Sequence, residues 1–409
     1  MSKTQHTRTG WLVGAMGVCL LVAGAAGADV STDRPGSILI FPKVVNDGTR
    51  QTVIQISNTG NSTTQARCFY LNGDTCGETD FNIALTKQQP THWNVGDGRS
   101  PFSGRYGSQN GQGGLAPGLV PAVPLGFEGA LLCVEVDGGD DPIAGNHLKG
   151  EATLLGGTTN PSDSSKYNGI AVNGTSNNGN NSLALDNAEY NACPGATRVN
   201  LVNPRMVDPG AQSLGNWGLC GDPSGQVCSA DGDCNDACYE GTCTISGALC
   251  DVAVGCGVGE GTCSPFASVS TSVTVLPCNL DLNGLIPTTV QLSLAGTDGL
   301  EQTFSSSETV TCWGNFVLDV PTPDTPFATI EIISQFGGPV LAVVEAVHGD
   351  ANGNVSTAAM NAHIETGTCL AGLRVGESCS FASDCPLATP PGGNSTCVAP
   401  TATIKLPTN

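Results

Sequence analysis

Cysteine is the residue type best placed to do chemistry in this chain, and its spacing indicates which chemistry. Eight cysteines lie in the 44 residues from Cys220 to Cys263. Zinc sites pair thiolates two to four residues apart, often with histidine. Only two of the gaps here are that short, and no histidine lies between His147 and His348. Irregular gaps suit disulfides, which hold together segments too small to bury a core. We therefore interpret this stretch as disulfide-bonded.

The cysteine-rich stretch is also repetitive. The pattern G-x-x-C-x5-C followed by [GS]-T-C occurs over residues 225–243, over 247–263 and again, far downstream, over 376–397. The gap of five residues is the same in all three copies, which indicates an internal repeat. Similar short disulfide-rich repeats occur in extracellular proteins, where they form rigid spacers or binding surfaces. We expect two repeats in one loop insertion and one repeat in a second.

The first residues have the form of a secretory signal peptide. Lys3 and Arg8 precede an apolar run over residues 11–26, and a small-residue cleavage pattern ends at Ala28. A membrane anchor is the alternative, but the run is short and rich in Gly and Ala. Cleavage would remove Cys19 and leave 18 cysteines. An even number in an exported chain indicates complete pairing, so we expect nine disulfides in a secreted or cell-surface protein.

All cysteines of the mature chain are expected to be disulfide-bonded. For those outside the repeats we predict the pairs Cys68–Cys76, Cys133–Cys193 and Cys278–Cys312, which are neighbours in chain order. The first pair flanks Asn72-Gly73, a hairpin turn signal. The complete set is Cys68, Cys76, Cys133, Cys193, Cys220, Cys228, Cys234, Cys238, Cys243, Cys250, Cys256, Cys263, Cys278, Cys312, Cys369, Cys379, Cys385 and Cys397.

The charge of the chain excludes one class of partner. Without the signal peptide it has 13 Lys and Arg against 36 Asp and Glu, a net charge of −23. Nucleic-acid binding needs a basic surface, so nucleic acid is not an expected partner. No later segment is long and apolar enough to be a transmembrane helix. The expected partner is an extracellular protein or a glycan.

The best candidate for catalysis is the segment around His92 and Trp93, with Asp97 close in sequence. The chain contains no nucleophile elbow, zinc-protease helix or phosphate-binding loop. A Ser-His-Asp arrangement needs only one histidine, so His92 stays open as a catalytic residue. The alternative is a packed turn with Trp93 anchored in the core, because aromatic residues usually report burial. We favour this alternative and expect no catalytic residue.

Two acidic features of the sequence are candidate functional sites. Glu135 and Asp137 alternate on one strand and so share a face, where paired carboxylates could do acid-base work. A solvated face is the simpler interpretation, because Asp137 opens an apparent turn over residues 137–141. Separately, three Asx-rich runs have the spacing of calcium ligands, although none completes an EF-hand and turns explain them equally well. The candidate calcium ligands are Asp231, Asp233, Asp281 and Asp350.

The elements that would carry these residues are β-strands. Residues 81–85 and 289–294 alternate apolar and polar side chains, so one face of each is expected to be buried. Similar segments recur at regular spacing with turn signals between them, which predicts an all-β fold of two antiparallel, immunoglobulin-like β-sandwiches. Residues 94–118 and 156–182 are expected to be long loops. The predicted domains are a signal peptide over 1–28, sandwich one over 29–216, a cysteine-rich insertion over 217–264, sandwich two over 265–366 plus 401–409, and a second insertion over 367–400.

The framework also resembles a group of secreted bacterial β-rich proteins without an assigned activity. The matching stretches are residues 81–93, 126–133, 145–153 and 190–194. This resemblance implies bacterial export and says nothing about chemistry. We expect a non-catalytic structural or adhesive binding protein. The alternatives are an extracellular hydrolase and a calcium- or carbohydrate-binding module.

Overall fold

All regular structure in the described part of the computed structural model is β-strand, as predicted. The description covers residues 30–99, 118–157, 162–176, 179–202, 268–283, 287–298, 301, 303–318, 327–349, 355–365 and 397–408, with short stretches between 218 and 265 and between 367 and 379. The predicted signal peptide lies outside these residues. Within them, no helix is long and apolar enough to cross a membrane.

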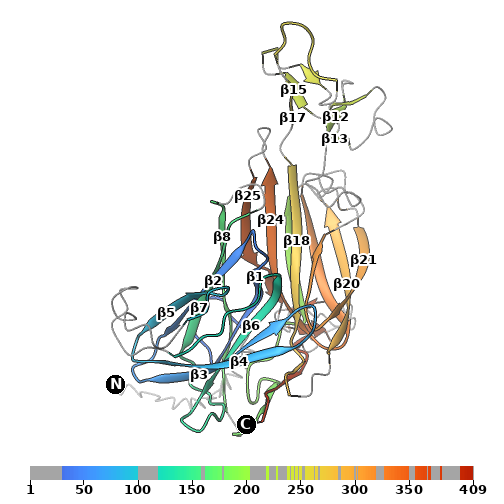
Figure 1. Ribbon diagram of the computed structural model, residues 1–409. Helices are drawn as coiled ribbons and strands as arrows, with labels where there is room; N and C mark the ends of the chain where they lie inside the picture. The colour runs from blue at the N-terminus through green and yellow to red at the C-terminus, as the bar shows by residue number, and fades with distance from the viewer. Residues whose placement is uncertain are drawn as a thin grey trace, which may run out of the picture.

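Nine strands build the first sandwich (Figure 1). They pair in the order β4-β3-β6-β1-β2-β7-β8, with β5 on β2 and β9 on β1. Strands β1 and β2 meet at one residue pair, Asn46 and Gln51. The sheet folds over at this corner, and its two halves enclose a common core. The strands are β1 (Ile38–Asn46), β2 (Gln51–Asn58), β3 (Thr64–Asn72), β4 (Glu78–Leu85), β5 (Pro90–Asn94), β6 (Phe127–Val136), β7 (Leu148–Leu155), β8 (Ser164–Asn168) and β9 (Ile170–Val172).

The alternation of side chains explains which faces are buried. Phe81, Ile83 and Leu85 of β4 all lie in the core of the first sandwich, as predicted. In β1 the residues from Ile38 to Phe41 are all apolar, because both faces of the strand are covered. Phe41 lies in the core of the sandwich, whereas Ile40 lies in a second core on the other side of the sheet.

The second sandwich consists of two sheets around their own core. Their strand orders are β21-β20-β23-β11-β26 and β22-β18-β24-β25. The strands are β11 (Ala196–Val202), β18 (Ser268–Pro277), β20 (Thr289–Asp298), β21 (Thr303–Thr311), β22 (Gly314–Val317), β23 (Phe327–Phe336), β24 (Val340–Gly349), β25 (Val355–Asn361) and β26 (His363–Glu365).

The strand pairings move two of the predicted domain boundaries. β11 falls within 29–216, but it pairs with β23 and β26 and so belongs to the second sandwich. The segment 401–409, assigned to sandwich two, contributes β30 (Ala402–Lys405) to a separate small sheet with β10 (Ser182–Leu185) and β19 (Leu280–Asp281). This sheet helps to cover the core between the sandwiches, because Leu183, Leu280 and Ile404 lie in it. Its β19–β30 pairing is parallel, an exception to the antiparallel pattern.

Part of a predicted loop is ordered as strand. Residues 156–182 were expected to be a loop because they are rich in Gly and Asn, but β8 and β9 lie within them. Tyr167 of β8 and Ile170 and Val172 of β9 are buried. A few large apolar side chains are therefore enough to order this polar segment. Most of the other predicted loop, 94–118, lies outside the described residues.

The three framework disulfides all join segments that are far apart in sequence, and all three predicted pairings are wrong. Cys68 bonds Cys133 within the first sandwich. Cys76 bonds Cys312 across 236 residues and ties the two sandwiches together. Cys193 bonds Cys278. Cys68 and Cys133 are register partners on adjacent strands β3 and β6, and strand pairing, not sequence order, brings these cysteines together.

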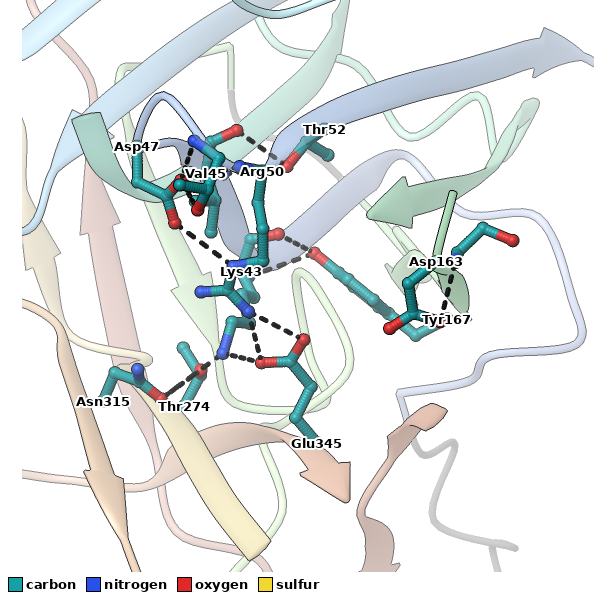
Figure 2. A network of polar contacts seen from close by, with 12 residues as sticks. Lys43, Val45, Asp47, Arg50, Thr52, Asp163, Tyr167, Thr274, Asn315 and Glu345 are labelled. Atoms are coloured by element: carbon teal, nitrogen blue, oxygen red, sulfur yellow. Dashed lines mark hydrogen bonds and ion pairs between the residues drawn. The ribbon is translucent and has the colours of Figure 1, made fainter. Parts of the chain in front are cut away.

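A buried charge cluster also joins the sandwiches (Figure 2). The Lys43 ammonium of β1 forms an ion pair with the Glu345 carboxylate of β24, and the two side chains are 1% and 3% exposed. Arg50 Nη1 lies 3.1 Å from Glu345 Oε1. Lys43 Nζ also donates to Asn315 Oδ1 of β22 at 3.5 Å. Each charged group thus has a partner, which buried charges require.

The cysteine-rich stretches form three small sheets with the same topology. In each, the first strand is central and pairs with the next two: β12 with β13 and β14, β15 with β16 and β17, and β27 with β28 and β29. The strands are β12 (Gly218–Cys220), β13 (Val227–Cys228), β14 (Cys238–Tyr239), β15 (Gly241–Cys243), β16 (Leu249–Cys250), β17 (Cys263–Pro265), β27 (Gly367–Cys369), β28 (Ser378–Cys379) and β29 (Cys397–Val398). We call these units module one, module two and module three.

The modules correct the limits of the sequence repeat. Each begins with a G-x-C strand, so Cys243 opens module two and does not close module one. The register is the same in all three. The first cysteine faces the last one in the pairs Cys220–Cys238, Cys243–Cys263 and Cys369–Cys397. The repeat is therefore a structural unit. It begins one strand earlier than the sequence pattern predicted.

Candidate binding surface

Module two is a small three-stranded sheet that two disulfides hold together. Cys243 bonds Cys256, and Cys250 bonds Cys263. Cys243 and Cys250 are buried at 3% exposure each, so the sulfur atoms take the place of a hydrophobic core. The sulfurs of Cys243, Cys250 and Cys256 lie within 4.8 Å of one another. Because they are oxidised in disulfides, they are not thiolate ligands for a metal.

Module two exposes three large β-branched side chains. Ile245 is 75% exposed, Val254 83% and Val258 109%. Ile245 N donates to Glu260 O at 3.0 Å, and Glu260 N donates to Gly257 O at 3.1 Å. The turn that carries Val258 therefore lies against the segment that begins at Ile245. We call Ile245, Val254 and Val258 the apex of module two.

The position of module two makes its apex accessible. Figure 1 shows β12, β13, β15 and β17 in a projection beyond the ends of β18 and β24, away from both termini. No described residue of modules one or two lies in the apolar cores of the sandwiches. The disulfides fix the shape of the module, so its exposed apolar side chains cannot collapse inward. Contiguous exposed apolar patches mark interaction surfaces.

The charge around the modules has one sign. Between Arg205 and Arg374 the chain has 18 Asp and Glu and no Lys or Arg. This segment includes modules one and two and most of the second sandwich. A surface with a charge of one sign steers partners of the opposite sign. The apex therefore belongs to a chain segment whose Asp and Glu are not balanced by any Lys or Arg.

Trp93 of the candidate catalytic segment lies in the core of the first sandwich. Trp93 is 3% exposed, and its Nε1 donates to Tyr70 Oη at 2.6 Å. Its ring meets Phe81 edge-on, with centroids 6.0 Å apart. His92 is half-buried on the opposite face of β5, since neighbouring side chains alternate. Asp97 accepts a bond from Asn94 Nδ2 at 2.9 Å. Trp93 is a core anchor, as the favoured interpretation predicted.

The predicted carboxylate pair divides into two different roles. Asp137 is exposed and accepts from the backbone of Gly139 at 2.8 Å and of Asp141 at 3.1 Å, as expected for a turn. Glu135 is 1% exposed, so the expectation of a solvated face is wrong for this residue. The reason is that β6 is covered on both faces, which alternation alone does not indicate.

Glu135 belongs to a buried polar cluster that the sequence did not reveal. Its Oε1 lies 2.7 Å from His147 Nδ1, and its Oε2 accepts from His147 N at 3.1 Å. Thr64 Oγ1 donates to Glu135 Oε1 at 3.3 Å and lies 3.4 Å from His147 Nδ1. A Cβ at Gly145 would meet Glu135 Oε1 at 2.1 Å. The glycine beside the histidine is the one sequence signal for this close approach.

The cluster does not have the geometry of a catalytic triad. In a triad the carboxylate and the hydroxyl bond opposite nitrogens of the imidazole ring. Here Glu135 and Thr64 both approach Nδ1 of His147. The hydroxyl is therefore not placed for activation by the ring. The arrangement instead fixes the segment that leads into β7.

The candidate calcium ligand Asp281 has a protein partner. Its Oδ2 lies 3.1 Å from Lys405 Nζ, and its Oδ1 accepts from Asn283 N at 3.2 Å. Asn279 accepts from Thr403 N at 2.8 Å. These contacts tie β19 to β30, and the lysine ammonium occupies the place that a cation would take. Asp231, Asp233 and Asp350 lie outside the described residues.

No protein-family model and no curated protein matches the chain. Among solved structures, Thermotoga maritima 1070 has 11% identity and a TM-score of 0.23, over 34% of this chain and 95% of that one. A viral chemokine binding protein of rodent gammaherpesvirus Peru has 9% identity and a TM-score of 0.16, over 80% and 84%. A lectin from Pleurotus ostreatus has 11% identity and a TM-score of 0.14, over 82% and 82%. Scores this low carry no argument about function.

Proposed function

We propose that this protein is an exported, non-catalytic adhesive binding protein that contacts its partner through module two. The observation that carries the proposal is the apex of Ile245, Val254 and Val258, held exposed on a disulfide-braced unit at the end of a rigid body. Burying such side chains in an interface recovers about 1.5–3 kcal/mol each. The signal-peptide pattern and the disulfides support export, since disulfides persist in oxidising compartments.

The body of the molecule supports this role by being rigid. Cys76–Cys312 and the Lys43–Glu345 pair lock the two sandwiches together. The two sandwiches therefore form one mechanical unit and not a flexible string of domains. The Glu135–His147 cluster does not support a hydrolase triad built on His147, because its hydroxyl and carboxylate approach the same ring nitrogen.

The chemistry of the apex favours a basic protein partner. The three side chains are aliphatic, whereas sugar rings and base rings are usually bound by aromatic ones. The 18 acidic residues of the surrounding segment, with no basic residue, would repel an anionic membrane or a second copy of the chain. A polypeptide segment with both aliphatic and Lys or Arg side chains complements this surface best.

The test is a peptide-binding experiment with matched surface variants. The probes are a peptide of alternating lysine and leucine and its counterpart with glutamate in place of lysine. We expect the wild-type protein to bind the lysine peptide alone, more weakly as salt rises. The variant Ile245→Ser with Val254→Ser and Val258→Ser should lose this binding. The control variant Leu119→Ser with Leu125→Ser and Phe336→Ser, which removes exposed apolar groups elsewhere, should retain it. Equal binding by both variants would show that the apex is not the contact surface.

A further inference from the structure

A small cavity opens beside the β3–β4 hairpin of the first sandwich, far in sequence from the modules. Its volume is about 240 Å³, below the roughly 300–1,000 Å³ of sites for drug-sized ligands. The rings of Tyr70 and Phe127 and the side chain of Val123 supply apolar lining, and Thr75 and Glu78 supply polar lining. The cavity thus suits a small ligand with an apolar body and a polar end.

One carboxylate oxygen of Glu78 lacks a hydrogen-bond donor among the described residues. Its Oε2 atom is buried and accepts no hydrogen bond from any described residue. Arg67 is already bonded to other groups. Its guanidinium donates to Asp80 Oδ2 at 2.8 Å and to Pro407 O at 3.1 Å. Burial and the neighbouring Asp80 raise the pKa of Glu78, with Arg67 opposing them. A buried acceptor without a donor destabilises the protein, and a bound donor would remove this cost.

The wall of the cavity is held in place before any ligand arrives. The turn that carries Thr75 is closed by Asn72 Oδ1, which accepts from Asp74 N at 3.0 Å and from Thr75 N at 2.9 Å. Cys76 in the same turn is bonded to Cys312 of the second sandwich. A Cβ at Gly73 would meet Trp313 Cε3 at 2.3 Å, so the indole lies directly on the turn. Preorganisation of this kind reduces the cost of binding.

We propose that this cavity binds a small organic cation, with an alkylammonium group donating to Glu78 and its alkyl part against Tyr70 and Phe127. An ammonium donates a charge-assisted hydrogen bond to a carboxylate, which is stronger than a neutral one. The rings of Tyr70 and Phe127 offer apolar contact to the alkyl part of the ligand. The acidic charge of the whole chain adds to the attraction. The site is separate from the apex of module two and does not depend on the function proposed for it.

The test compares two probes of matched size, n-butylammonium and n-butanol, by calorimetry on the full mature protein. We expect n-butylammonium to bind at least about tenfold more tightly, as one charge-assisted bond implies. Glu78→Gln should abolish the preference. The control Glu308→Gln removes one exposed carboxylate from β21 and should leave the preference intact. The affinity for n-butylammonium should also rise with pH as Glu78 loses its proton, and this rise should be absent in Glu78→Gln.

An amide NMR titration of the wild-type protein provides a readout that does not depend on a variant folding. Addition of n-butylammonium should shift the amide signals of Thr75, Gly77 and Thr79, which line the cavity. The proposal is overturned if the wild-type protein shows no preference for the ammonium. It is equally overturned if Glu78→Gln keeps that preference, or if the shifts fall only at other acidic positions.

Discussion

Lys43 of the first sandwich and Glu345 of the second form an ion pair from which water is almost wholly excluded (Figure 2). Glu345 has a second cation, Arg50, at 3.1 Å, and Arg50 in turn bonds Asp47 at 3.2 Å. The pair lies where β1 meets β24, so it fixes how the two sandwiches dock. The contribution of this ion pair to stability depends on both charges being present, because either charge alone would be buried without a full partner.

We expect removal of one partner to be more damaging than removal of both. Glu345→Leu should lower the free energy of unfolding by about 3–5 kcal/mol, because Lys43 is left buried without its anion. The double variant Lys43→Met with Glu345→Leu should recover much of this loss, since Arg50 keeps Asp47. Urea unfolding of the three proteins measures the difference. Equal stability of the single and double variants would show that the pair contributes nothing to docking.

The same cluster predicts a dependence of stability on pH. Burial raises the pKa of Glu345, but Lys43 and Arg50 outweigh this effect and hold it below its ordinary value of 4.5. For Lys43 the balance is the reverse, and burial lowers its pKa despite Glu345. The pH dependence of stability follows the Glu345 carboxylate, because Arg50 is always charged and keeps Glu345 ionised in either state of Lys43.

A lowered carboxylate pKa stabilises the folded state above the unfolded pKa, and this stability is lost as pH falls through the folded pKa. The wild-type protein should therefore lose stability below about pH 4.5 more steeply than the Lys43→Met, Glu345→Leu variant, in which this carboxylate is absent. Other carboxylates are common to both proteins and cancel in the comparison. Thermal melting at a series of pH values gives the two slopes, and parallel slopes would contradict the assignment.

The sequence predicted the strands well but not their partners. Alternation at Phe81, Ile83 and Leu85 identified a buried face, because a strand with one covered face shows that pattern. It gave no sign that β11 would pair with β23, since strands of any two segments can satisfy the same alternation. The immunoglobulin-like detail of the prediction stays a prediction.

Sequence order was a poor guide to the disulfides for the same reason. Cys76 lies close to Cys68 in the chain, yet its partner is Cys312 on the other sandwich. Pairing across strands and domains depends on tertiary contacts that spacing does not encode. The exposed apex could be recognised only from the structure, because Ile245 and Val258 look like ordinary core residues in the sequence.

The common plan of the modules predicts the pairings that the described residues leave open. Module two has the bonds Cys243–Cys256 and Cys250–Cys263, and module three has Cys379–Cys397, which matches the second of these. Correspondence along the sequence then predicts three further bonds and completes nine. These are Cys220–Cys234, Cys228–Cys238 and Cys369–Cys385. Mass spectrometry of peptides cut without reduction identifies the bonds directly, and a bond from module one to module two would contradict the plan.

The two neighbouring residues His92 and Trp93 should respond very differently to truncation. Trp93→Ala removes a buried ring and its bond to Tyr70, and should cost about 3–5 kcal/mol in the free energy of unfolding. His92→Ala, at a half-buried position on the other face of β5, should cost about 1 kcal/mol or less. Chemical denaturation measures both. A large loss at His92 alone would reverse the structural assignment of the two side chains.

In the proposed division of roles, the modules carry binding while the sandwiches carry stability. The most direct measurement is binding of the lysine-leucine peptide to a protein in which a Gly/Ser linker replaces residues 218–265, with its melting followed in parallel. Because the cores contain none of the replaced residues that the structure describes, and loop closure depends weakly on length, we predict cooperative melting close to that of the wild type. The same folded protein should not bind the peptide. Peptide binding at wild-type strength by this folded protein would contradict the account.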